Sequence, residues 1–333
     1  MLDRRRFGVT AAAATTFSVP RAWAAVDYSL VNKAVALGSR TGGSGSIRFD
    51  GKTIAAWGGQ YKQYELKSST KTIGALLLGV AIKRKGILLG DLARNYLPTL
   101  GTPPTQNDAT GWPRLITIRD LATHVAGFDK KGGFEKLLFR PQSKWSYSDG
   151  GANWLADVLT VRFATDLRTV LRNRLLLPIG ADGGVSWRLN RYRPQRINGV
   201  IRREFGSGIS ASVDALSRIG QMLLDGGRGL IDPSFIEAMS TPKPTVAAVP
   251  QTGTTVHPGA NHHYGLLCWN NGDGALTGVP RDAYWSWGLG DSFMLVVPSK
   301  RIVVARLGPA WQPYWGDLAA IQPFFASVCA AVD

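Results

Sequence analysis

The chain has 333 residues, of which 44% are hydrophobic and 19% are charged. This balance is typical of a globular protein with one or two domains, and it excludes a disordered or collagen-like chain. The formal net charge is +16, yet Lys and Arg are spread along the chain without a run of five and without a nucleic-acid-binding motif. We therefore expect a cationic surface and no nucleic-acid partner.

The N-terminal segment 1–24 has the pattern of a cleavable export signal. Three arginines starting at Arg4 precede an apolar and small-residue run over 8–19, and Ala22 and Ala24 give the small-x-small spacing of a signal-peptidase site. The run is shorter than the ~20 apolar residues that span a bilayer, so no integral membrane span is predicted. The arginine pair followed by Phe resembles a twin-arginine signal, with a plain secretory signal as the alternative. Either route predicts an exported protein, periplasmic or secreted.

A helix, a strand and a second helix are predicted next along the chain. Residues 28–37 have the pattern of a short helix, and segment 46–57 mixes apolar and polar residues as a strand does, after a Gly- and Ser-rich linker. From Ser68 onward apolar residues recur at helical spacing until Gly86. We predict a mostly buried helix between these two residues.

The rest of the chain predicts a helical section followed by strands. Three stretches within 92–180 have helical periodicity, and Ser212 can cap a further helix. Strand-like runs occupy 264–269, 293–297 and 302–307, and an amphipathic helix closes the chain at 315–332.

This order of elements predicts an α+β fold. The simplest arrangement is an antiparallel sheet built from both ends of the chain and flanked by the N- and C-terminal helices, with a mainly helical domain inserted. In this interpretation residues 25–85 and 205–333 form the sheet domain, together with the buried helix, and residues 86–204 form the inserted domain.

Cysteine and histidine usage argues against metal and disulfide chemistry. Cys268 and Cys329 are the only cysteines, so the fold has no disulfide framework and no thiolate metal site. A disulfide between the two cysteines is the alternative in an exported protein, but two separately buried thiols are expected. The four histidines include no His-Glu-x-x-His pattern, and adjacent His262 and His263 would point to opposite faces of a strand. We predict no metal and no cofactor.

A Ser-x-x-Lys pattern occurs twice, at 68–71 and at 240–243. The second copy contains Pro242 and cannot form a regular helix, so we attribute it to chance. In the first copy the i, i+3 spacing at the start of a buried helix places Ser68 and Lys71 on one face. A buried lysine near the positive end of a helix dipole can lose its proton and serve as base for a serine nucleophile. The alternative is that Ser68 merely caps the helix and Lys71 is solvated.

Several segments in order resemble one family, the serine β-lactamase and penicillin-binding-protein superfamily, in its class C, esterase and 6-aminohexanoate-dimer hydrolase branch. The resemblance spans nearly the whole mature chain. It is carried by SSTKTIGALLLGVAIKRKGILLGDLARNYLP at 68–98, LITIRDLATHVAGF at 115–128, KWSYSDGGANWLADVL at 144–159, GSGISASVDALSRIGQMLLDGG at 206–227, YGLLCW at 264–269 and YWSWGLGDSFMLVVPSKRIVVARLG at 284–308.

The resemblance implies roles for residues in the middle segments. Tyr147 corresponds to the tyrosine that shares proton transfer with the lysine, and a core aromatic is its alternative. His124 corresponds to a structural histidine. Asp149 stands where the family often has Asn, which places a negative charge beside Lys71.

The last segment implies a different substrate from that of a β-lactamase. β-Lactamases carry Lys-Thr-Gly here, whereas this chain has Trp287 directly before Gly288, Leu289 and Gly290. The backbone N–H of Leu289 would complete an oxyanion hole with that of Ser68, supported by the two glycines. Loss of the lysine removes the cation that holds a β-lactam carboxylate, so efficient β-lactamase activity is not expected.

We predict a serine hydrolase that acts on a small or oligomeric ester or amide through an acyl-enzyme on Ser68, with Lys71 and Tyr147 as the general base pair. The alternatives are a D-alanyl peptidase or β-lactamase, and a non-catalytic binding protein of the same fold. A Ser-His-Asp enzyme of the α/β-hydrolase type is disfavoured, because no Gly-x-Ser-x-Gly pentapeptide occurs.

Overall fold

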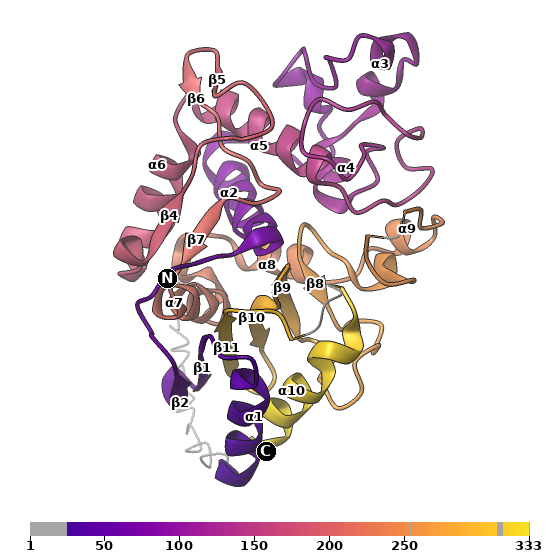
Figure 1. Cartoon of the computed structure of the whole chain (residues 1–333). Coiled ribbons are helices and arrows are strands. Elements are labelled where there is room, and N and C mark those ends of the chain that lie inside the picture. The colour runs from indigo at the N-terminus through magenta and orange to yellow at the C-terminus, as the bar shows by residue number, and fades with distance from the viewer. Residues whose placement is uncertain (1–24, 254, 312–315, 333) are drawn as a thin grey trace, which may run out of the picture.

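The structure is a computed structural model that describes residues 25–253, 255–311 and 316–332. The predicted signal segment 1–24 lies outside the described residues. In Figure 1 the large sheet and the two terminal helices occupy the lower part of the molecule, and most of the remaining helices lie above them. Within the described ranges, no helix has both the length and the apolar character needed to cross a membrane.

A six-stranded sheet joins the two ends of the chain. Its strand order is β2-β1-β11-β10-β9-β8, and every pairing in it is antiparallel. The strands are β1 (Ser44–Phe49), β2 (Lys52–Trp57), β8 (Trp269–Asn270), β9 (Tyr284–Gly288), β10 (Ser292–Val297) and β11 (Ile302–Leu307). Because β1 from the start of the chain pairs with β11 from its end, the predicted sheet from both ends is confirmed.

Helices cover both faces of this sheet. On one face α1 (Tyr28–Ser39) and α10 (Leu318–Ala330) pack against each other (Figure 1). On the other face α7 (Val213–Leu224) contacts β1, β10 and β11, and Ser212 caps it by accepting a hydrogen bond from Ala215 N. Side chains of β10 alternate between the two cores, with Leu295 in one and Met294 in the other. This period-two alternation explains why the strand is apolar throughout.

The predicted buried helix is α2 (Thr70–Lys85), which follows a 3-10 turn at Lys67–Ser69. It contacts α5 (Asp149–Phe163), α8 (Pro233–Ser240) and β9, so it lies between the sheet and the other helices. The helix ends at Gly86, which has a left-handed φ of 67° that glycine adopts without steric cost.

The section predicted as helical contains more loop and strand than its periodicity indicated. Residues 124–148 contain no helix, and at the start of this segment His124 and Gly127 turn the backbone with φ of 64° and 95°. The short strand at 185–187 pairs with a strand outside the predicted insert, so the division into two domains stays a prediction. The other α-helices and strands in the described ranges are α3 (Gln106–Ala109), α4 (Ile118–Thr123), α6 (Leu167–Leu171), α9 (Pro244–Ala247), β5 (Arg196–Ile197), β6 (Val200–Ile201) and the small sheet of β3 (Tyr64–Glu65), β7 (Ile209–Ala211) and β4 (Val185–Trp187).

Three local predictions are corrected. Segment 46–57 is a hairpin of β1 and β2, since Asp50 and the glycine after it both adopt positive φ. Within 264–269 only Trp269 belongs to a strand, because Leu267 has a φ of 51° that turns the backbone. His262 and His263 lie in a 3-10 turn and not in a strand.

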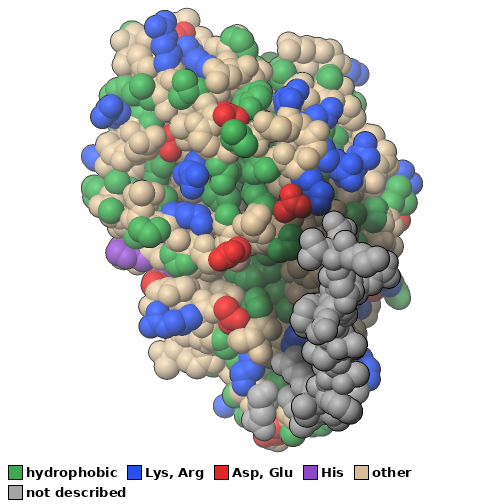
Figure 2. All heavy atoms as spheres, turned by 180° about the vertical axis from the view of Figure 1, so that it is seen from behind, with side chains coloured by type: hydrophobic (Ala, Val, Ile, Leu, Met, Phe, Trp, Pro, Cys, Tyr) green, Lys and Arg blue, Asp and Glu red, His purple; other side chains and the backbone are tan. Residues whose placement is uncertain are grey.

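Charge and thiol placement follow the sequence expectations. Lys and Arg side chains are spread over the face seen in Figure 2, with acidic side chains among them. Cys268 and Cys329 are both buried and unpaired, as two separate thiols. Burial raises the pKa of both thiols, to about 12 for Cys329. They therefore act as small apolar core residues.

Candidate active site

Ser68 occupies the middle of the 3-10 turn that leads into α2. The turn is tied to the sheet, because the hydroxyl of Ser69 donates a 2.6 Å hydrogen bond to the carbonyl of Ser292. It also lies directly against the end of β9, since a Cβ on Gly288 would be 2.0 Å from the Leu66 carbonyl oxygen. Only glycine allows the strand this close to the turn.

Lys71 lies one turn after Ser68 and is 1% exposed. Its Nζ donates a hydrogen bond of 3.2 Å to Ser68 Oγ and another of 3.1 Å to the carbonyl of Gly206. The structure thus brings the two residues of the first Ser-x-x-Lys pattern together on one helix face.

Asp149, the first residue of α5, forms ion pairs with both Lys71 and Lys130. Although burial raises the pKa of Asp149, the two neighbouring ammonium groups outweigh it and hold the pKa below its ordinary value. The carboxylate is therefore charged at neutral pH. Lys71, the residue predicted to serve as base, has its Nζ atom directly against this carboxylate.

The aromatic ring of Tyr147 lies between two cations and a tryptophan. The Nζ atoms of Lys71 and Lys130 are 4.8 and 5.6 Å from its ring centroid, and the ring stacks on Trp269 at 5.7 Å. Tyr147 is 2% exposed. The ammonium groups face the negative π-cloud and fix the ring beside Lys71.

The hydroxyl of Tyr147 is hydrogen-bonded to the hydroxyls of Ser68 and Tyr264. Burial raises the pKa of Tyr147 above its ordinary value, and the charge of Lys130 and these two hydrogen bonds oppose that rise only in part. The phenol therefore carries its proton at neutral pH. It is placed to exchange a proton with Ser68.

His124, predicted to be structural, lies behind the tyrosines. Its Nε2 is 3.0 Å from the hydroxyl oxygen of Tyr264, and the backbone N–H of Ser148 donates a 3.4 Å hydrogen bond to its Nδ1. Burial, together with the nearby charge of Lys71, holds the pKa of His124 well below its ordinary value. The imidazole is neutral.

Leu289 comes directly after β9, whose last residue, Gly288, touches the 3-10 turn that carries Ser68. The two segments predicted to supply the oxyanion-hole N–H groups, those of Ser68 and Leu289, are therefore in direct contact. Gly290 continues the chain with a φ of 88°, which favours glycine. Trp287, just before Gly288, is 1% exposed, and its Nε1 donates a 3.2 Å hydrogen bond to Asp291.

The second Ser-x-x-Lys pattern has no such geometry. Ser240 is the last residue of α8, and its hydroxyl bonds to the Glu237 carbonyl at 3.4 Å. Lys243 Nζ donates instead to the hydroxyl of Thr241 at 3.1 Å. The two side chains do not meet.

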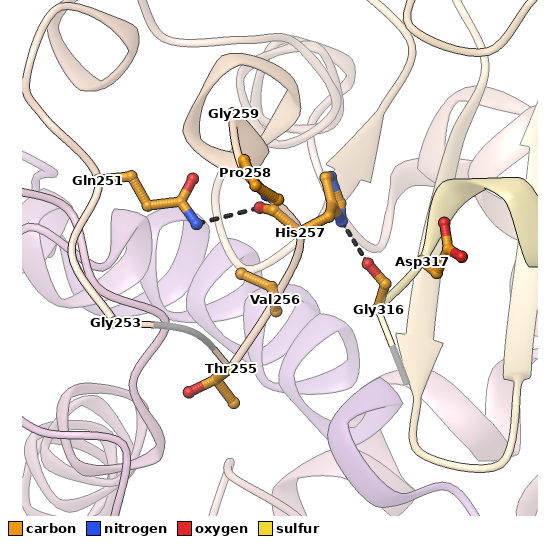
Figure 3. A pocket seen from close by; sticks show the side chains of 9 residues that line it. All are labelled: Gln251, Gly253, Thr255, Val256, His257, Pro258, Gly259, Gly316 and Asp317. Atoms are coloured by element: carbon orange, nitrogen blue, oxygen red, sulfur yellow. Dashed lines mark hydrogen bonds between the residues drawn. The ribbon is translucent and has the colours of Figure 1, made fainter. Parts of the chain in front are cut away.

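A cavity of about 450 Å³ has Gln251, Val256 and Asp317 among its lining residues. His257 lines it, and the His257 ring lies 5.7 Å from the Trp269 ring that stacks on Tyr147. Figure 3 shows two hydrogen bonds in the cavity wall, one from Gln251 to the carbonyl of His257 and one between the ring of His257 and the carbonyl of Gly316. No group of three or more His, Cys, Asp or Glu side chains suited to a metal ion occurs among the residues that the structure describes.

Sequence reasoning did not identify Lys130 and Tyr264. Lys130 comes from the loop before α5, and Tyr264 lies in a run interpreted as a strand. Neither stands at a fixed spacing from Ser68, so only the fold brings them to the site.

Solved structures share this fold. A putative β-lactamase from Bacteroides dorei has 15% sequence identity and a TM-score of 0.69, and the match covers 92% of this chain and 99% of that one. EstCE1, described as a hydrolase with promiscuous acyltransferase activity, has 17% identity and a TM-score of 0.69 over 91% and 99% of the two chains. A family VIII carboxylesterase has 15% identity and a TM-score of 0.66 over 93% and 99%.

No curated protein matches the chain in sequence. The Beta-lactamase family model matches residues 29–315, which is most of the chain. Together with the α+β fold, this match assigns the protein to the Beta-lactamase family, as a hydrolase related to β-lactamases.

Proposed function

We propose that this protein is a serine hydrolase that cleaves an ester or amide bond through an acyl-enzyme on Ser68. The observation that carries the proposal is the contact of the Ser68 hydroxyl with the side chains of a lysine and a tyrosine. Ser68 Oγ is 3.2 Å from Lys71 Nζ and is hydrogen-bonded to the Tyr147 hydroxyl. A serine with such neighbours can lose its proton as it attacks a carbonyl carbon.

The acylation step balances without a cofactor. A bond forms between Ser68 Oγ and the carbonyl carbon, and the Ser68 proton passes to the oxygen of Tyr147. Tyr147 gives its own proton to the leaving oxygen or nitrogen, whose bond to the carbon breaks. The Lys71 ammonium and the N–H groups of Ser68 and Leu289 stabilise the negative charge that develops. Water then attacks the acyl-enzyme by the reverse proton path and releases the acid.

The role of Lys71 in this proposal follows from Asp149. From its contact with the Asp149 carboxylate we infer that Lys71 is an ammonium group, which has no lone pair to accept the serine proton. In this proposal Tyr147 accepts that proton, and Lys71 contributes its positive charge beside Tyr147 and Ser68. The positive charge favours the form of Tyr147 that has given up its proton.

An ester is the favoured substrate class, with an amide as the second. Two structural neighbours are described as a carboxylesterase and as a hydrolase with acyltransferase activity. Trp287 supplies no cation for a β-lactam carboxylate.

Covalent labelling tests the proposal. The purified protein is incubated with a fluorophosphonate, and the modified peptide is mapped by mass spectrometry. We expect one adduct, on Ser68. No adduct on Ser68 and no turnover of short esters or amides would favour a binding protein of the same fold, whereas nitrocefin hydrolysis at ordinary enzyme rates would favour a β-lactamase.

We further propose that the protein acts after export, as segment 1–24 implies. Replacement of Arg4 and Arg5 by Lys, with cell fractionation, distinguishes the two export routes. A twin-arginine route predicts that the variant stays in the cytoplasm, and a plain secretory route predicts normal export.

A further inference from the structure

A hydrogen-bond chain approaches the site from behind Tyr147. His124 Nε2 lies 3.0 Å from the Tyr264 hydroxyl oxygen, and that hydroxyl is bonded to the hydroxyl of Tyr147. All three side chains are at most 2% exposed. The mechanism proposed above uses Tyr147 but assigns nothing to His124 or Tyr264.

A backbone N–H group determines which member of each hydrogen bond is the donor. The N–H of Ser148 can only donate, so the His124 Nδ1 atom that it meets must be an acceptor. Because the imidazole is neutral, its one proton is on Nε2 and is donated to Tyr264. The Tyr264 proton is then free to be donated to Tyr147. Tyr147 cannot send its own proton back along the same bond.

We propose that Tyr264, oriented by His124, is a positioning residue that directs the proton of Tyr147 toward the leaving group of the substrate. This inference rests on the proposed function. During acylation the Ser68 proton moves to Tyr147, while the original Tyr147 proton moves to the leaving oxygen and forms the alcohol. Each donor in the chain also polarises the next one, which makes Tyr147 a better proton donor.

The proposal predicts that the loss of rate depends on the leaving group of the ester. A leaving group that departs readily as an anion, such as p-nitrophenolate, needs little help from a proton donor. An alkoxide such as ethoxide needs a proton as its bond breaks. Loss of the directing bond must therefore slow alkyl esters more than p-nitrophenyl esters, whereas general damage to the site slows both alike.

The test measures kcat/KM of the purified protein on p-nitrophenyl, phenyl and ethyl butyrate, which share one acyl group. For Tyr264→Phe we expect a loss on ethyl butyrate about tenfold larger than the loss on p-nitrophenyl butyrate. The matched control is Tyr284→Phe, a buried tyrosine of β9 that should leave the pattern across the series unchanged. His124→Asn should show the same selective loss, and it should add nothing further in the Tyr264→Phe background.

Each outcome decides between two ideas. Equal losses of Tyr264→Phe on all three esters, with a folded protein by thermal unfolding, would overturn this inference alone. Absence of turnover of every ester by the wild-type protein, with no adduct on Ser68, would overturn the proposed function and this inference with it. If Tyr264→Phe does not fold, the same three esters are measured with His124→Asn, which removes the other partner of the Tyr264 hydroxyl. A selective loss on ethyl butyrate then supports the inference, and equal losses overturn it.

Discussion

Asp149, at the N-terminus of α5, forms an ion pair with Lys71 of α2. The carboxylate also pairs with Lys130, so it lies between two ammonium groups of which one is almost fully buried. A buried ammonium group without a counter-charge is costly, so this pair links the stability of the fold to the charge of the site.

Asp149→Asn is expected to lower the free energy of unfolding by about 3 kcal/mol at pH 7, because it leaves Lys71 buried without its partner. Urea denaturation measures this change. Asp50→Asn serves as the control, since Asp50 pairs with Arg301 at the surface and its loss is worth less than about 0.5 kcal/mol. Equal stability of Asp149→Asn and the wild type would contradict the burial argument.

The same pair predicts a pH dependence of stability. The pKa of Asp149 is lower in the folded than in the unfolded protein, so its contribution is present above the ordinary carboxylate pKa. It is lost as pH falls below about 4 and through the folded-state pKa. Unfolding at a series of pH values should show the gap between wild type and Asp149→Asn closing on acidification. A gap that stays constant or widens would rule out the ion pair as its source.

Tyr147→Phe is expected to lower kcat/KM on p-nitrophenyl butyrate by about 100-fold or more, because the serine proton then has no acceptor. Its thermal unfolding should be close to that of the wild type, since the ring and its contacts with Trp269 remain. Steady-state kinetics of the folded variant measures the effect. A Tyr147→Phe enzyme with nearly full activity would remove Tyr147 from the mechanism.

Gly288→Ala is expected to displace the end of β9 from the nucleophile turn, because the new Cβ would lie 2.0 Å from the Leu66 carbonyl oxygen. We expect a loss of about 1–3 kcal/mol in stability and at least about tenfold in kcat/KM. Gly90→Ala is the control, as nothing lies within 4 Å of its Cβ position. Similar activities of the two variants would show that the strand end does not shape the site.

The parts of the fold that depend on local pattern could be predicted from the sequence. The apolar spacing from Ser68 to Gly86 gives α2, and the hairpin of β10 and β11 follows from two β-branched runs around a short turn. The mix of apolar and polar residues in segment 46–57 did not indicate the turn at Asp50. A positive φ at a non-glycine residue has no strong signal in the local sequence.

The site could be predicted only in part, for a physical reason. Ser68 and Lys71 are adjacent on one helix, so their spacing alone brings them together. Lys130 and Tyr264 reach Tyr147 through loops, and no periodicity encodes that approach. The ion pair between Lys71 and Asp149 likewise depends on the packing of α5 against α2, which no local pattern encodes.

Turnover of p-nitrophenyl butyrate by Ser68→Ala, compared with Ser240→Ala, is the most direct measurement of the central claim. Both variants remove one hydroxyl from a Ser-x-x-Lys pattern, but only the first pattern brings its lysine to the serine. We expect Ser68→Ala to be inactive and unlabelled by fluorophosphonate, and Ser240→Ala to keep wild-type activity. A folded Ser68→Ala that still hydrolyses the ester at the wild-type rate would contradict the account.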